Sequence, residues 1–133
     1  MSKSDKIDLE DYKWKNRLIF IFAPSRNHPG YQAQKTETEG KIPEIIDRDL
    51  VVFEILEDGQ SKVGDDILGT EAITFLREKF NVEPGKYTVI LVGKDGGEKL
   101  RGDENVPLAD IFSLIDTMPM RQQEMKEKEK RQN

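Results

Sequence analysis

The residues of this sequence best suited to chemistry follow one uninterrupted apolar run. Residues 18–22 read Leu-Ile-Phe-Ile-Phe, and four polar side chains follow shortly after, namely Ser25, Arg26, Asn27 and His28. A short, continuous run of branched and aromatic residues is typical of a strand that is covered on both faces. Ligands and catalytic groups gather at the exit of such strands in α/β proteins. These four residues therefore form the first candidate site.

Two kinds of chemistry suit these side chains. Ser25 with His28 as its base would make a hydrolase or transferase, but no orienting carboxylate or oxyanion hole can be identified in the sequence. Alternatively, Arg26, Asn27 and His28 beside a helix start would hold a small anionic ligand, a carboxylate or a phosphate. The second use needs no catalytic machinery, and we favour it.

The most informative feature of the site is an absence, because the sequence contains no cysteine and only one histidine. Thiolate nucleophiles, disulfides, Cys-ligated metals and multi-histidine zinc sites are thereby excluded. Asp58, Asp65 and Asp66 lie in one acidic loop, but their spacing matches no EF-hand. We expect neither a metal nor a cofactor.

Composition narrows the class of protein further. The chain has 133 residues, enough for one domain with a real core, and a net charge of −5, which disfavours nucleic acid as a partner. No apolar run approaches the roughly 20 residues of a membrane span. The N-terminus is charged and lacks the apolar centre of a signal peptide, so we expect a cytoplasmic protein without membrane contact.

The first half of the chain predicts a strand, a helix and a strand. After the strand at 18–22, which Pro24 should end because it has no N–H, a weak helical pattern covers 29–39. A second short helix is expected near 44–47, followed by a strand at 50–56. A helical connection makes these two strands parallel, with a right-handed crossover.

The second half begins with an acidic loop at 57–69 and a helix at 71–80 that Thr70 should cap. A third strand is predicted at 87–92, and a turn containing Asp-Gly joins it to an antiparallel fourth strand at 98–101. A strongly amphipathic helix follows at 107–118.

The order of these elements predicts the fold. Both continuously apolar strands, 18–22 and 89–92, must lie inside the sheet, and the more polar ones outside. The result is an α/β three-layer sandwich with a four-stranded mixed sheet in the order second, first, third, fourth, which is the thioredoxin-like arrangement. We expect a loose end at 1–6, one domain at 7–120 and a polar, frayed tail at 121–133.

A second candidate surface involves the segment before the first strand. Residues 7–17 alternate basic and aromatic side chains, which can mark a nucleic-acid surface. We favour an extended lead-in whose Tyr12 and Trp14 face the core while its lysines face water. Aromatic, flexible apolar and cationic side chains of the kind found at interfaces gather here and after the last helix, at Trp14, Arg17, Met120 and Arg121.

Five segments of the sequence together resemble one known domain family, sometimes called P-DUDES, whose function is unknown. They are residues 9–17 (Leu-Glu-Asp-Tyr-Lys-Trp-Lys-Asn-Arg), 18–24, 48–53, 92–97 and 115–125. The family comprises short bacterial proteins and domains of animal sushi-repeat and matrix proteins. The resemblance implies a thioredoxin-like, peroxiredoxin-related fold, from which oxidoreductase activity has been proposed for relatives.

This chain departs from the residues that such redox activity requires. No cysteine lies at 25–29, where the reactive thiol of thioredoxin-like enzymes follows the first strand. The cis-proline expected before the third strand is also missing, since Pro84 is displaced and Tyr87 stands there. We therefore expect a non-catalytic module that binds an unknown protein or a small anion. The alternatives are a peroxiredoxin-related oxidoreductase that has lost its thiol chemistry, and the Ser25–His28 hydrolase or transferase.

Overall fold

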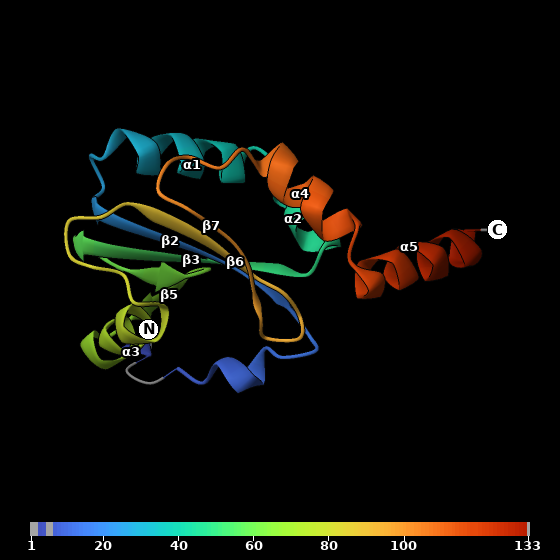
Figure 1. Cartoon of the computed structure of the whole chain (residues 1–133), viewed down its shortest axis with the longest axis horizontal. Helices are drawn as coiled ribbons and strands as arrows, with labels where there is room; N and C mark the ends of the chain where they lie inside the picture. Colours follow the sequence, from blue (N-terminus) through green and yellow to red (C-terminus); the bar gives the residue numbers. More distant parts are fainter. Residues whose placement is uncertain (1–2, 5–6, 133) are drawn as a thin grey trace.

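The protein is built on one mixed sheet with helices on both faces (Figure 1). The computed structural model describes residues 3–4 and 7–132, and within them the sheet order is β1-β5-β4-β3-β2-β6-β7. The strands are β1 (Lys3–Ser4), β2 (Arg17–Ser25), β3 (Leu50–Asp58), β4 (Lys62–Val63), β5 (Asp66–Leu68), β6 (Thr88–Val92) and β7 (Glu98–Gly102). The helices are η1 (Leu9–Asp11), α1 (Pro29–Glu39), α2 (Ile42–Asp47), α3 (Thr70–Phe80), α4 (Leu108–Asp116) and α5 (Pro119–Gln132).

The four predicted strands, observed as β3, β2, β6 and β7, lie in the predicted order. Strand β2 pairs in parallel with β3 and antiparallel with β6, and β7 is antiparallel to β6. Residues 18–23 of β2 and all of β6 are buried, as continuous apolar runs require. The thioredoxin-like core was therefore predicted correctly from chain order and apolar content.

The predicted number of four strands was wrong, because the sheet continues past β3. Residues 57–69, expected to be a loop, contain β4 and β5, which turn at Gly64 (φ +58°) and leave β3 inside the sheet. Strand β1 adds to β5 in parallel. Strands of two or three residues are too short to show an alternating pattern, so the sequence carried no signal for them.

Two local predictions at element ends were also wrong. Strand β2 runs through Pro24 to Ser25, because β6 pairs only as far as Phe22 and a position with one neighbouring strand tolerates proline. Helix α3 begins at Thr70 itself, so the cap is Gly69, which has no side chain to accept a hydrogen bond.

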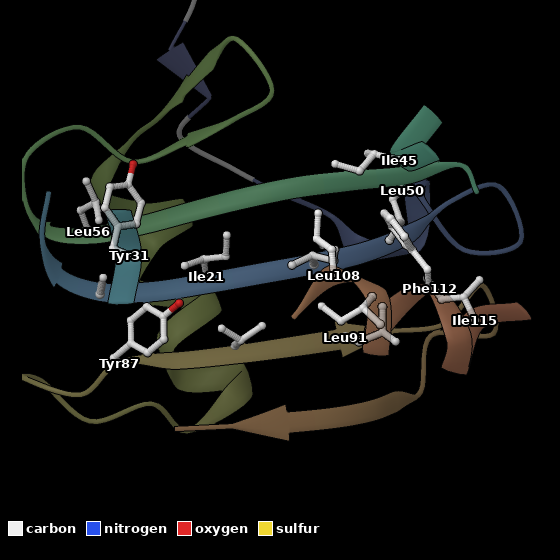
Figure 2. Packing of buried hydrophobic residues seen from close by; sticks show 14 residues of the cluster. Ile21, Tyr31, Ile45, Leu50, Leu56, Tyr87, Leu91, Leu108, Phe112 and Ile115 are labelled. Carbon is white, nitrogen blue, oxygen red and sulfur yellow. The ribbon is translucent and has the colours of Figure 1, made fainter. Parts of the chain in front are cut away.

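The two faces of the sheet have separate cores. On one face, α1, α2 and α4 cover the alternate residues Ile19, Ile21 and Ala23 of β2. Figure 2 shows this core, with Tyr31 and Tyr87 near one end of the strands and Phe112 and Ile115 near the other. On the opposite face, Phe80 of α3 packs against the ring of Phe20, which also stacks on Phe22 and Phe53 of the sheet.

The C-terminal part forms helix α5, which projects away from the sheet in Figure 1. Helix α5 includes residue 120, where we expected the domain to end. Side chains of its first two turns form hydrogen bonds with residues of β2, α2 and α4. Of the expected loose end, residues 1–2 and 5–6 lie outside the described part of the chain. Among the described residues, no helix has the length and apolar character to cross a membrane.

Candidate functional site

At the predicted site after β2, the His28 side chain is hydrogen-bonded to neighbouring backbone N–H groups. The His28 side chain caps α1, since its Nδ1 accepts hydrogen bonds from the N–H groups of Gly30 (3.1 Å) and Tyr31 (3.4 Å). Pro29 has no N–H, and the Gln32 N–H donates to the His28 carbonyl at 3.0 Å. All N–H groups of the first turn are therefore used, and none is left for an anion.

The other predicted residues of this site are not brought together for catalysis. The Asn27 N–H donates to Ser25 Oγ at 3.3 Å, and the hydrogen bond that joins His28 to Ser25 runs between backbone groups, from the His28 N–H to the Ser25 carbonyl at 3.2 Å, not between their side chains. The His28 ring instead stacks on Tyr87, with 4.9 Å between ring centroids and 7° between planes. Burial raises the pKa of the Tyr87 hydroxyl to about 12, so the phenol stays neutral. Arg26 and Asn27 are exposed.

A cavity of about 590 Å³ lies beside this stack, between the start of α1, the 81–88 loop and the end of β7. Three carboxylates line it, at Glu83, Asp103 and Glu104, against the cations Lys86 and Arg101. Arg101 already pairs with Glu98 at 2.9 Å. The surplus of negative charge weighs against the small anionic ligand, which stays a prediction at Ser25, Arg26, Asn27 and His28.

The opposite end of β2 carries a buried ionic cluster. Arg17, the first residue of the strand, is 1% exposed, and its two terminal nitrogens donate to the two Glu124 oxygens at 3.1 Å each. The buried Lys94 ammonium donates to the same carboxylate at 2.7 Å and to Asp49 at 2.9 Å. One residue of α5 is thus bonded to both β2 and the β6–β7 turn.

A second part of the cluster fixes the start of α5 to α2 and α4. The buried Arg121 guanidinium donates to Asp47 at 2.7 Å and to Asp116 at 3.0 Å, and Asp116 also accepts from Arg48. We define the ionic cluster as four cations and four carboxylates, namely Arg17, Arg48, Lys94 and Arg121 with Asp47, Asp49, Asp116 and Glu124.

These contacts keep the carboxylates ionised. Hydrogen bonds from Lys128 and Arg121 lower the pKa of Asp47 to about 2. Burial raises the pKa of Glu124, but hydrogen bonds from Arg17 and Lys94 outweigh it and leave the pKa below its usual value. The carboxylates of Asp47 and Glu124 are therefore ionised at neutral pH.

Two residues of the predicted interaction surface belong to this cluster. The side chains of Arg17 and Arg121 are buried and paired, and a role for them in binding stays a prediction. Their acidic partners come from α2, α4 and α5, and no local sequence signal relates these segments. Lys94 and Glu124 were not predicted as site residues for the same reason.

Next to the cluster, an apolar groove of about 240 Å³ opens to solvent. We call it the Trp14 groove. It is lined by Trp14, Arg17, Gly93, Lys94, Asp95, Lys99, Met118, Pro119 and Met120. Trp14 is 59% exposed and Met120 is 39% exposed. Two predicted surface residues, Trp14 and Met120, thus come together although they are distant in the sequence.

The exposure of Trp14 contradicts its expected place on the core, whereas Tyr12 packs as predicted, edge-on against Phe53 at 5.7 Å. Residues 7–17 are not extended, since η1 and a turn occupy them. The turn gives Trp14 a φ of +69°, and its N–H donates to the Lys94 carbonyl at 2.6 Å. The prediction assumed an extended backbone, in which side chains alternate between core and solvent. The left-handed conformation at Trp14 breaks this alternation, and its side chain points to solvent.

Comparison with known proteins gives a family but no activity. Residues 8–124 match a family model described as "Domain of unknown function (DUF4174)". Coiled-coil domain-containing protein 80 of Danio rerio is 27% identical over 88% of this chain, and sushi repeat-containing protein SRPX2 of Xenopus laevis is 25% identical over 91%. The chain spans only 15% and 27% of the length of these two relatives.

Solved structures similar to this one include peroxiredoxins. Plasmodium vivax 2-Cys peroxiredoxin has a TM-score of 0.63 and 10% identity, covering 88% of this chain and 85% of its own. Xanthomonas campestris bacterioferritin comigratory protein has a TM-score of 0.65 and 11% identity, covering 84% of each chain. At this identity the similarity concerns the fold alone, which is thioredoxin-like.

Proposed function

Because the chain belongs to the DUF4174 family, whose name records no activity, we propose its function from its own residues: it is a non-catalytic module that binds another protein. The observation that carries this proposal is the Trp14 groove, where a tryptophan lies mostly exposed beside a methionine. Large aromatic and methionine side chains are enriched at protein interfaces.

The backbone at Trp14 supports this proposal. A non-glycine residue with positive φ costs folding free energy, and such outliers gather at functional sites. The tryptophan here does not recover that cost through burial, because more than half of its surface is in water. Its position is instead imposed by the turn and by the hydrogen bond to Lys94. A rigid, exposed ring is a suitable anchor for a partner side chain.

The catalytic alternatives have less support. Thiol–disulfide exchange by this chain alone is excluded, because its sequence holds no cysteine. The peroxiredoxin likeness is one of fold, and it is compatible with a scaffold that has lost its thiol chemistry. Ser25 and His28 are engaged in separate backbone hydrogen bonds. The net charge of −5 does not favour nucleic acid. A cytoplasmic location stays a prediction.

The proposal can be tested by selecting ligands for the groove. A phage library of random peptides is passed over immobilised Trp14→Ala protein to remove peptides that bind elsewhere, and is then selected on the wild type. Phe75→Ala is the matched control, because Phe75 is another exposed aromatic residue, 42% accessible, that lies outside the groove on α3.

We expect the selected peptides to bind the wild type and Phe75→Ala with equal affinity and not to bind Trp14→Ala. Trp14 is the only tryptophan, so its fluorescence reports binding directly. Failure to enrich peptides, or peptides that bind Trp14→Ala as well as the wild type, would contradict the proposed function.

A further inference from the structure

The size of the Trp14 groove indicates what it can hold. Its volume of about 240 Å³ lies below the roughly 300–1,000 Å³ of typical small-molecule sites. Its apolar walls are Trp14, Met118, Pro119 and Met120. A space of this size and lining suits one or two apolar side chains rather than a cofactor.

The charges at the groove are already paired. Arg17 and Lys94 share the Glu124 carboxylate, and Lys94 also bonds to Asp49. The third lining cation, Lys99, pairs with Asp95 at 2.9 Å. An acidic partner would have to compete with these carboxylates, so it would gain little from the groove. Electrostatic complementarity therefore favours an uncharged occupant.

One buried polar atom of a residue that lines the groove lacks a hydrogen-bond partner among the described residues. Arg17 Nε has no hydrogen bond among the described residues, although the two terminal nitrogens of the same guanidinium are both bonded. Arg17 lines the groove and is almost fully buried. Buried donors without an acceptor are rare in folded proteins. A main-chain carbonyl is a neutral acceptor that would satisfy it.

We propose that the Trp14 groove binds an uncharged polypeptide segment of a partner, whose bulky apolar side chain lies between Trp14 and Met120 and whose main-chain carbonyl accepts from Arg17 Nε. This inference rests on the proposed function and adds the chemistry of the partner. Arg17 Nε is buried, so the carbonyl reaches it only when neighbouring side chains move, and the groove contains two methionines, whose unbranched chains rotate readily. Met120 belongs to α5, and the ionic cluster bonds α5 to the rest of the protein. The cluster therefore also fixes the position of this wall of the groove.

The test uses the peptides selected on the wild type, synthesised with acetylated and amidated ends. Binding is measured by Trp14 fluorescence at about 50 and about 500 mM NaCl, since exposed charge pairs are screened over this range. Replacing the apolar anchor of the peptide by Ala and replacing its neighbours by Ser identifies which residues carry affinity. The Arg17 Nε–H resonance of nitrogen-15-labelled protein is followed in the same titrations.

The expected peptides share one bulky apolar residue among uncharged ones, and salt should change their affinity by less than about threefold. The Arg17 Nε–H proton should move downfield on binding. An amide-to-ester replacement at the accepting carbonyl should reduce both the shift and the affinity, because an ester carbonyl is the weaker acceptor.

Three results would overturn the inference while leaving the proposed function in place. Selected peptides could be acidic and weaken by more than about tenfold with salt. The Nε–H resonance could stay unmoved at saturation. Self-association could occur in sedimentation and be abolished by Trp14→Ala, which would make a second copy the occupant. Peptides that bind Trp14→Ala as well as the wild type, by contrast, would contradict the proposed function itself.

Discussion

The guanidinium of Arg17 and the carboxylate of Glu124, which lie 107 residues apart, form a two-point pair with both N–O distances at 3.1 Å. The pair joins the first residue of β2 to α5, the last helix. Because the same carboxylate also accepts from Lys94, it holds the β6–β7 turn against α5. Met120, one turn earlier in α5, is thereby kept opposite Trp14.

Glu124→Gln should destabilise the fold. Removing the charge leaves Arg17 and Lys94 buried without their shared counter-ion, and breaking a buried pair costs about 3 kcal/mol. Urea unfolding should show this loss. Lys41→Met is the control, because it removes an exposed pair with Glu44 at 3.9 Å and should cost less than about 0.5 kcal/mol. Equal stability of Glu124→Gln and the wild type would contradict the role of the pair.

Acid should release the α2–α5 contact. The pKa of Asp47 is about 2 when folded, below the usual 3.8, because Lys128 and Arg121 donate to its carboxylate. A lowered folded pKa contributes stability above about pH 4, which is lost as the pH falls toward about 2. Carboxyl carbon resonances should give Asp47 a midpoint near 2, and Arg121→Met should raise it. A wild-type midpoint near 3.8 would contradict this arrangement.

His28 should act as a helix cap rather than as a base. His28→Ala removes the acceptor for Gly30 and Tyr31 and should lower the free energy of unfolding by about 1 kcal/mol. His28→Asn keeps an acceptor at the cap and should recover most of that loss. If the two variants are equally destabilised in thermal unfolding, stacking on Tyr87 rather than capping is the main role of the ring.

Ser25 should not behave as an activated nucleophile, since His28 Nδ1 accepts from backbone N–H groups and Ser25 Oγ bonds to the Asn27 N–H rather than to the imidazole. A serine-directed fluorophosphonate should label the wild type and Ser25→Ala to the same background level. Labelling that is lost in both Ser25→Ala and His28→Asn would restore the hydrolase or transferase alternative.

Glycine should be accommodated better than alanine at position 14. The φ of +69° is free of strain for glycine and costs alanine about 1 kcal/mol. Trp14→Gly should therefore be more stable than Trp14→Ala by about that amount in urea unfolding, while neither variant binds the selected peptides. Equal stability would show that the turn relaxes when the ring is removed.

The predicted part of the fold rests on local patterns. Continuous apolar runs identified β2 and β6 as central, and helical spacing gave α1, the short α2 and α4 to within a few residues. Strands β4 and β5 were missed because they are too short for a pattern. Trp14 was misplaced because alternation assumes an extended backbone, which the turn after η1 interrupts.

The sequence by itself determined the order of β3, β2, β6 and β7 and the absence of thiol chemistry, because apolar runs and composition are properties of the chain alone. Only the tertiary structure decided that Arg17 meets Glu124, that His28 uses up the N–H groups at the start of α1, and that Trp14 faces Met120 in solvent. Each of these contacts depends on distances and backbone angles that arise when distant segments pack together, and neither residue type nor spacing encodes them.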